Sequence, residues 1–141
     1  MDNRITKETL YEFLLKNDNS YYAQIMRECG CISFVDKYPN EDYTGHNYIF
    51  KRGFVDSYSK EFNILFIENK SYLIYKTEEN QILVWVCYTE EKYRRRKYML
   101  KLLEKLSDIN PDYNILVDTF NEGLMKLCNK IKRNNISLLE R

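Results

Sequence analysis

The stretch "QILVWVCYTEEKYRRRKYMLKLLEKL", residues 81–106, decides the fold. Its first part, residues 81–89, is a nearly uncharged run rich in β-branched and aromatic side chains, which predicts a buried strand. From Tyr98 onward, methionine and leucine recur at the spacing of one helical face, which predicts a helix over 97–107. A strand, a polar loop and an amphipathic helix therefore follow one another directly.

The amino end of the predicted helix carries four consecutive cations: Arg94, Arg95, Arg96 and Lys97. Aligned peptide dipoles already give this end about half a positive charge, so each cation there costs roughly 0.3–1 kcal/mol. A solvated surface patch is one interpretation, and a bound phosphate is another, because an anion reverses the penalty. A third is contact with nucleic-acid phosphates, with Tyr93 and Tyr98 available for stacking on bases.

Two further strands are predicted on the amino-terminal side of this stretch. Apolar runs rich in β-formers place them at 62–68 and 71–77, followed by the strand at 81–89. The segments between them, 69–70 and 78–81, are short enough for hairpin turns. The three strands should therefore form an antiparallel meander.

On the carboxyl-terminal side the pattern continues as a strand and a helix. Residues 113–120, "YNILVDTF", predict a fourth strand, and Pro111 ends the helix before it. Asn121 is predicted to cap a helix over 122–132, and a short apolar segment follows at 136–139. A helix that joins two strands of one sheet makes a right-handed crossover, so the strands that flank it should run parallel.

The first part of the chain is predicted to be helical. Thr6 is a candidate cap for a helix over 7–17, and Ser20 is a candidate cap for a second helix that Gly30 ends. The inner face of the first helix is predicted to consist of Leu10, Phe13 and Leu14. Residues 31–60 carry no pattern that assigns an element.

The predicted fold class is α/β, or α+β if the meander is counted, with a mixed sheet and helices on both faces. Length and composition, with 44% hydrophobic and 30% charged residues, indicate one soluble domain over 1–141. The net charge of +1 provides no global field for nucleic acid or an anionic membrane. The amino terminus has no signal-peptide core and no apolar run could span a bilayer, so a cytoplasmic location is expected, in the host cytoplasm if the source is viral.

The four cysteines are expected to be reduced in that compartment. Cys29 and Cys31 form a C-x-C pair without a second half, and His46 is the only histidine. No structural metal site is therefore expected.

Residues 81–106, followed by "NILVDTFNEGLMKLCNKI" at 114–131, resemble the GNAT superfamily of acetyl-coenzyme A-dependent N-acetyltransferases. The hallmark of that family is a strand, an Arg/Gln-x-x-Gly-x-Gly/Ala loop that opens a helix, a further strand and a helix started by asparagine. Arg94 falls on the first position of the loop, and Asn121 falls on the asparagine. In this chain the two small loop positions hold larger residues, Lys97 and Met99, and the usual tyrosine of the last helix is Cys128.

The resemblance implies acetyl-coenzyme A as the cofactor. Its pyrophosphate would lie on the amides of residues 95–99, and its pantetheine arm would enter a gap between strands 81–89 and 113–120. The implied cofactor-binding residues are Val86, Cys87, Tyr88, Arg94, Arg95, Arg96, Lys97, Tyr98, Met99 and Asn121.

Three residues are candidates for proton transfer. Glu90 or Tyr88 would serve the attacking amine, and the thiol of Cys128 would return a proton to the departing sulfur. Each also has a structural interpretation: Glu90 as a surface charge, Tyr88 as a strand residue and Cys128 as an inert core residue. Asn121 is likewise explained by a capping role alone.

The function expected from the resemblance is transfer of an acetyl group from acetyl-coenzyme A to a primary amine by direct attack. The acceptor, a small molecule, a protein or a nucleic-acid base, is not specified by the sequence. One alternative is a degenerate GNAT-fold interaction module, and another is a nucleic-acid-directed binder or base modifier that uses residues 94–97. A homodimer formed through the edge of the last strand is a further expectation.

Overall fold

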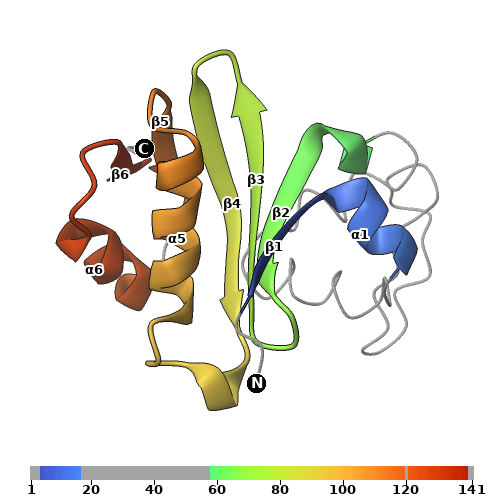
Figure 1. Ribbon diagram of the computed structural model, residues 1–141. Helices are drawn as coiled ribbons and strands as arrows, with labels where there is room; N and C mark the ends of the chain where they lie inside the picture. Colours follow the sequence, from blue (N-terminus) through green and yellow to red (C-terminus); the bar gives the residue numbers. More distant parts are fainter. Residues whose placement is uncertain (1–3, 17–57, 120, 140–141) are drawn as a thin grey trace.

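The computed structural model describes residues 4–16, 58–119 and 121–139, which contain a mixed sheet with helices on both faces (Figure 1). Six strands of the described chain form one sheet in the order β1-β2-β3-β4-β5-β6. They are β1 (Ile5–Thr9), β2 (Phe62–Ile67), β3 (Ser71–Glu78), β4 (Gln81–Thr89), β5 (Asn114–Val117) and β6 (Ile136–Leu138). The pairs from β1 to β4 are antiparallel, whereas β4–β5 and β5–β6 are parallel. The predicted fold class and meander are confirmed.

The helices are α1 (Leu10–Lys16), α5 (Tyr98–Ile109) and α6 (Glu122–Lys130), and short 3₁₀ turns span Tyr58–Glu61 and Glu91–Tyr93. None of the helices described is long and apolar enough to cross a membrane. Helix α5 begins and ends within two residues of its predicted bounds, and its carboxyl end precedes Pro111.

Helices α1 and α5 cover opposite faces of the sheet (Figure 1). Phe13 of α1 packs against Phe66 and Tyr72, with ring centroids 4.9 and 6.0 Å apart. The buried leucines of α5 instead belong to a core cluster that includes Leu65 and Leu73. Because successive strand residues point to opposite faces, residues 65 and 66 serve the two separate layers.

The predicted start of the first helix was wrong. Residues 5–9 form β1, which pairs along its whole length with β2, and the helix begins only at Leu10. Thr6 therefore lies in a strand, and Thr9 is the cap, since its Oγ1 accepts a hydrogen bond from the Glu12 amide at 3.1 Å. The predicted inner face, formed by Leu10, Phe13 and Leu14, is confirmed.

The second predicted helix lies outside the described residues, as do Cys29, Cys31 and His46. At the other end of the chain, the short apolar segment at 136–139 forms β6, which pairs with β5. Helix α6 is therefore a second crossover between parallel strands. Strand β5 itself is shorter than predicted, because its pairing with both neighbours ends at Val117.

Candidate cofactor-binding site

Strand β5 pairs with only the first part of β4. Their register runs from Gln81 opposite Asn114 to Val84 opposite Val117. The Asp118 amide then donates to the Val84 carbonyl at 3.0 Å, and no described strand pairs with the rest of β4 on this side. The predicted parallel pairing is confirmed, and the ladder ends in the middle of β4.

A β-bulge lies where the two strands part. In the β3–β4 ladder Tyr75 is opposite Val84 but Ile74 is opposite Val86, so Trp85 is the extra residue. A bulge bends its strand and increases the local twist. The carboxyl half of β4 therefore leaves the direction of β5 while it stays paired with β3.

The main chain at the end of β4 is oriented by β3. Ser71 Oγ donates to the Tyr88 carbonyl at 3.3 Å and shares a 2.8 Å hydrogen bond with Thr89 Oγ1. Backbone groups alternate in direction along a strand, so the main-chain groups of Cys87 and Thr89 point to the side from which β5 is missing. Arg94 Nε donates to the Thr89 carbonyl from that side, at 2.9 Å.

The loop between β4 and α5 contains two left-handed residues. After the 3₁₀ turn, the Arg94 amide donates to the Glu91 carbonyl at 3.2 Å. The next residues include Arg95 at φ 65° and Lys97 at φ 64°. Left-handed residues interspersed with ordinary ones turn successive amides toward one side and form an anion-binding concavity.

The amides of this concavity have no protein acceptor in the part of the chain that the structure describes. There, no carbonyl or side chain accepts a hydrogen bond from the amides of residues 95–100, and the first helical bond runs from the Lys101 amide to the Lys97 carbonyl. Lys97 occupies the loop position at which the GNAT pattern has glycine, and its backbone adopts the angle that glycine favours. Non-glycine residues held at such angles cost about 1–2 kcal/mol each and tend to occur at functional sites.

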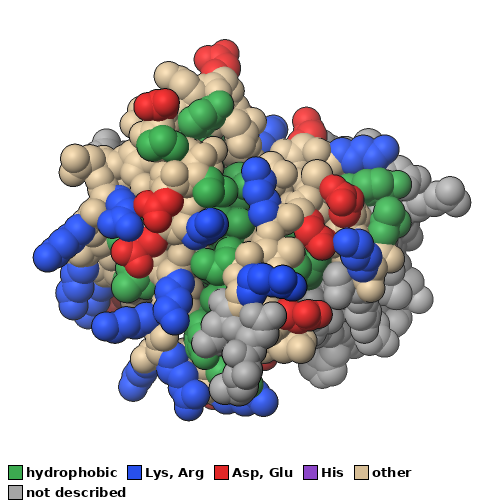
Figure 2. Space-filling model, in the orientation of Figure 1, with side chains coloured by type: hydrophobic (Ala, Val, Ile, Leu, Met, Phe, Trp, Pro, Cys, Tyr) green, Lys and Arg blue, Asp and Glu red, His purple; other side chains and the backbone are tan. Residues whose placement is uncertain are grey.

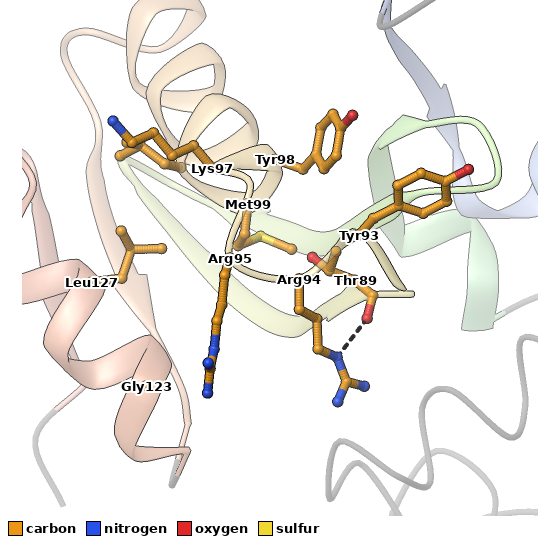
Figure 3. Close-up of a pocket in the computed structure, with 10 residues that line it drawn as sticks. Thr89, Tyr93, Arg94, Arg95, Lys97, Tyr98, Met99, Gly123 and Leu127 are labelled. Atoms are coloured by element: carbon orange, nitrogen blue, oxygen red, sulfur yellow. Dashed lines mark hydrogen bonds between the residues drawn. The ribbon is translucent and has the colours of Figure 1, made fainter. Parts of the chain in front are cut away.

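A cavity of about 390 Å³ lies between this loop and α6 (Figure 3). It is lined by Thr89, Tyr93, Arg94, Arg95, Lys97, Tyr98, Met99, Leu100, Gly123 and Leu127. Figure 3 shows Leu127 pointing from α6 toward Met99, while the Arg95 side chain extends away from that of Lys97. In Figure 2 basic side chains gather at the lower left, over the loop and α6. The cavity thus combines a cationic rim with apolar walls.

Five of the predicted cofactor-binding residues line this cavity: Arg94, Arg95, Lys97, Tyr98 and Met99. Arg96 does not, because its guanidinium lies over the Tyr93 ring, 5.9 Å from the centroid. Val86 is buried, and Cys87 and Tyr88 lie on the half of β4 that pairs with β3 but extends beyond the β5 ladder.

Asn121 is the cap of α6, as its capping interpretation predicts. Its Oδ1 accepts from the Leu124 amide at 2.9 Å, and its own amide donates to Thr119 Oγ1 at 3.0 Å. A Cβ added to Gly123 would lie 3.2 Å from Asn121 Oδ1, so glycine suits this tight first turn. The cap places the amino end of α6 beside the cavity, which Gly123 lines.

The three candidates for proton transfer occupy different environments. Glu90 and Tyr88 are half-buried near the end of β4, and the Arg94 guanidinium lies 5.8 Å from the centroid of the Tyr88 ring. Cys128 is 5% exposed and packs within the core, away from the cavity lining. Burial raises the pKa of its thiol to about 11. This environment fits the core interpretation of Cys128, because a thiol with so high a pKa is a poor acid near neutral pH.

Several cavity residues were absent from the predicted site: Thr89, Tyr93, Leu100, Gly123 and Leu127. Gly123 offered a signal, since it is one of only four glycines and follows the predicted cap closely. Leu127 offered none, because an apolar residue on an amphipathic helix is expected to pack into the core.

Together these features define a mixed α/β protein in which a cationic loop with two left-handed residues follows strand β4, beyond the point where β4 has parted from β5. No protein-family model and no curated protein matches the sequence. A similar solved structure is that of a protein from Bacteroides thetaiotaomicron assigned to the GNAT family of acetyltransferases. The identity is 18%, the comparison covers 89% of this chain and 67% of that one, and the TM-score is 0.47. A likeness at this level carries no conclusion about activity, which is inferred below from the loop and the cavity.

Proposed function

We propose that the chain binds acetyl-coenzyme A and transfers its acetyl group to a primary amine. One observation carries the proposal. The amides of residues 95–100 turn into a concavity with no acceptor among the described residues, and Arg94, Arg95 and Lys97 line the adjoining cavity. Amides and cations acting together suit a diphosphate group.

The residues present fit the parts of this cofactor. The amides of 95–100, with Arg95 and Lys97, would hold the pyrophosphate. The apolar walls formed by Met99 and Leu127 would contact the pantetheine arm, and the main chain of Cys87 would pair with its amides. The large side chain at Lys97 does not prevent the glycine-like backbone angle, which is φ 64°. Figure 3 shows this side chain directed away from that of Arg95.

The cofactor supplies a thioester as the acetyl donor. The chain would contribute mainly by positioning the reactants, which alone can lower a barrier by several kcal/mol (about 7–11 in well-oriented systems). The main-chain N–H of Cys87, which points to the side from which β5 is missing, would stabilise negative charge on the carbonyl oxygen. Glu90 or Tyr88 would take the proton from the attacking amine, directly or through water.

A nucleic-acid interface at the same loop is the second candidate, and the aromatic geometry disfavours it. Tyr98 is 8% exposed, and its ring meets that of Tyr93 nearly edge to face, at 84° with centroids 5.9 Å apart. Cations already lie over the Tyr93 ring, among them Lys92 and Arg96 at 5.2 and 5.9 Å. A base would therefore find no open stacking platform of the kind that single-strand binders use.

Ligand-induced stabilisation tests the proposal directly. Thermal unfolding is measured with acetyl-coenzyme A, with coenzyme A, with pantetheine, which has no phosphate, and with an oligonucleotide. At 100 times its dissociation constant a ligand adds about 2.7 kcal/mol, so a clear shift is expected with both coenzymes. Release of free thiol in the presence of a panel of amines then measures transfer.

Charge variants locate the binding site. The double variant Arg95→Gln with Lys97→Gln should abolish most of the shift. Lys105→Gln, which removes an exposed cation further along α5, should retain it. If millimolar coenzyme leaves the unfolding temperature unchanged, the proposed acetyltransferase activity is refuted. A salt-sensitive rise in the unfolding temperature with the oligonucleotide alone would favour the nucleic-acid interface.

A further inference from the structure

Lys70 is a buried lysine in the turn between β2 and β3. Its residue is 6% exposed, and lysine is rarely buried to this extent. Its ammonium lies over two rings at once, 5.5 Å from the centroid of Tyr93 and 5.6 Å from that of Tyr98. Such contacts are stronger when the cation is withdrawn from water.

Both of these rings line the cavity of the candidate site. Tyr93 precedes the cationic loop and Tyr98 follows it, so the two rings mark the ends of residues 94–97. One ammonium therefore contacts the rings at both ends of the loop, and Lys70 itself is not among the residues that line the cavity.

The main chain couples the same turn to the loop. The Glu90 amide donates to the Lys70 carbonyl at 2.8 Å, and the Lys70 amide donates to the Ile67 carbonyl at 2.9 Å. The neighbouring Ser71 binds the end of β4 through its hydroxyl group. The turn is therefore anchored to the sheet and contacts the loop both before and after its left-handed residues.

We propose that Lys70 is a positioning residue of the anion-binding loop. Its charge holds Tyr93 and Tyr98 in place, so that the amides of 95–100 are aligned before a phosphate group arrives. Preorganisation of this kind raises affinity because less ordering remains to be done on binding. The inference rests on the proposed function of the cavity, but it requires only that the loop binds a diphosphate.

The test compares neutral and charged replacements of Lys70. Lys70→Met keeps the length and removes the charge, whereas Lys70→Arg keeps a cation suited to aromatic rings. The matched control is Lys101→Met, because the exposed Lys101 ammonium lies 5.5 Å from the centroid of the same Tyr98 ring. Calorimetry measures the dissociation constants of inorganic pyrophosphate, coenzyme A and pantetheine for each protein.

We expect Lys70→Met to weaken binding of pyrophosphate and coenzyme A by about tenfold. Lys70→Arg should restore most of the affinity, and Lys101→Met should stay within about twofold of the wild type because its charge is screened. Pantetheine, which has no phosphate, should bind all variants with the same affinity. A variant that has lost its structure in general would bind pantetheine more weakly as well. If Lys70→Met does not fold, Tyr93→Leu, at a half-buried ring, should give the same selective loss.

The outcomes separate the two proposals. Equal affinity of Lys70→Met and the wild type for pyrophosphate overturns the positioning role while leaving the acetyltransferase intact. An Arg replacement as weak as the Met replacement also overturns it. Pyrophosphate binding that depends on Lys70 supports it even if coenzyme A does not bind, which would instead refute the proposed activity. A wild type that binds neither ligand refutes both.

Discussion

A glycine scan across the cationic loop tests the backbone geometry on which the candidate site depends. Arg95 and Lys97 have left-handed backbones, with φ of 65° and 64°, whereas Arg96 between them does not. The variants are Arg95→Gly, Arg96→Gly and Lys97→Gly. Each removes one cation from the amino end of α5, so the helix-dipole contribution of about 0.3–1 kcal/mol is similar in all three and cancels in the comparison.

Two opposing terms then remain. Glycine increases the entropy of the unfolded chain, which lowers the free energy of unfolding by about 0.4–1 kcal/mol in every variant. At Arg95 and Lys97 it also relieves the left-handed strain of about 1–2 kcal/mol, which Arg96→Gly does not. The two outer variants should therefore match or exceed the wild type in stability, and the free energy of unfolding of Arg96→Gly should lie about 1–2 kcal/mol below theirs.

Equilibrium unfolding in urea measures these differences, provided that the slopes agree among the variants. An alternating pattern along three consecutive residues has no explanation in overall charge or flexibility. Three equal losses would refute the left-handed loop and, with it, the concave arrangement of amides. Arg95→Ile, which places a β-branched side chain at a left-handed position, should be clearly less stable than the wild type.

Three further outcomes are expected. Asn121→Ala removes the α6 cap and should lower the free energy of unfolding by about 1 kcal/mol in urea, while Asn121→Asp should retain most of it. Asn135→Ala should cost about 2–3 kcal/mol in the same assay, because it removes two donated hydrogen bonds and leaves the buried Ser107 hydroxyl without its 2.6 Å acceptor; a loss below about 0.5 kcal/mol would contradict that network. Burial raises the pKa of Cys128 to about 11 and that of Tyr75 to about 12. Their neutral forms therefore contribute fully to the free energy of unfolding below about pH 9, and this contribution is lost as the pH rises through these values. Urea midpoints should therefore fall at alkaline pH, less steeply in Cys128→Ala and Tyr75→Phe.

The sequence predicts the carboxyl-terminal part of the fold well because its signals are local. The three meander strands are continuous apolar runs joined by short turns, and each lies within a residue or two of its predicted bounds. The cap at Asn121 and the stop at Pro111 fix helix ends through groups only a few residues away. Patterns of this kind need no knowledge of the tertiary structure.

Strand β1 was missed because its stability is not local. Residues 5–9, "ITKET", contain only one strongly apolar side chain, and a helical apolar pattern begins directly after them at Leu10. What makes them a strand is the edge of β2, whose residues 63–67 pair with them one to one. A partner so distant in sequence leaves no trace in the local pattern, and the helical interpretation prevailed for that reason.

Only part of the candidate site could be predicted from the sequence, because the rest depends on contacts between segments that are distant in sequence. The cations are evident in the sequence and the parting strands were implied by the family resemblance, but the α6 wall depends on how that helix packs. The bulge at Trp85 lacks the glycine that often marks one, so the point at which β4 leaves β5 could be placed only by the ladder itself.

The energetics of the loop give the strongest reason to expect a ligand. Four cations occupy a helix end that disfavours them by roughly 0.3–1 kcal/mol each, and two of the same residues also carry left-handed strain. Nothing in the packing requires either cost, since these side chains are exposed and glycine at the left-handed positions would avoid both. A single bound anion offsets both costs, because it attracts the cations and accepts hydrogen bonds from the amides that the left-handed residues turn outward. Removal of the cations should therefore raise the stability of the protein without ligand while lowering its affinity for diphosphate, a trade-off that a solvated surface patch would not show.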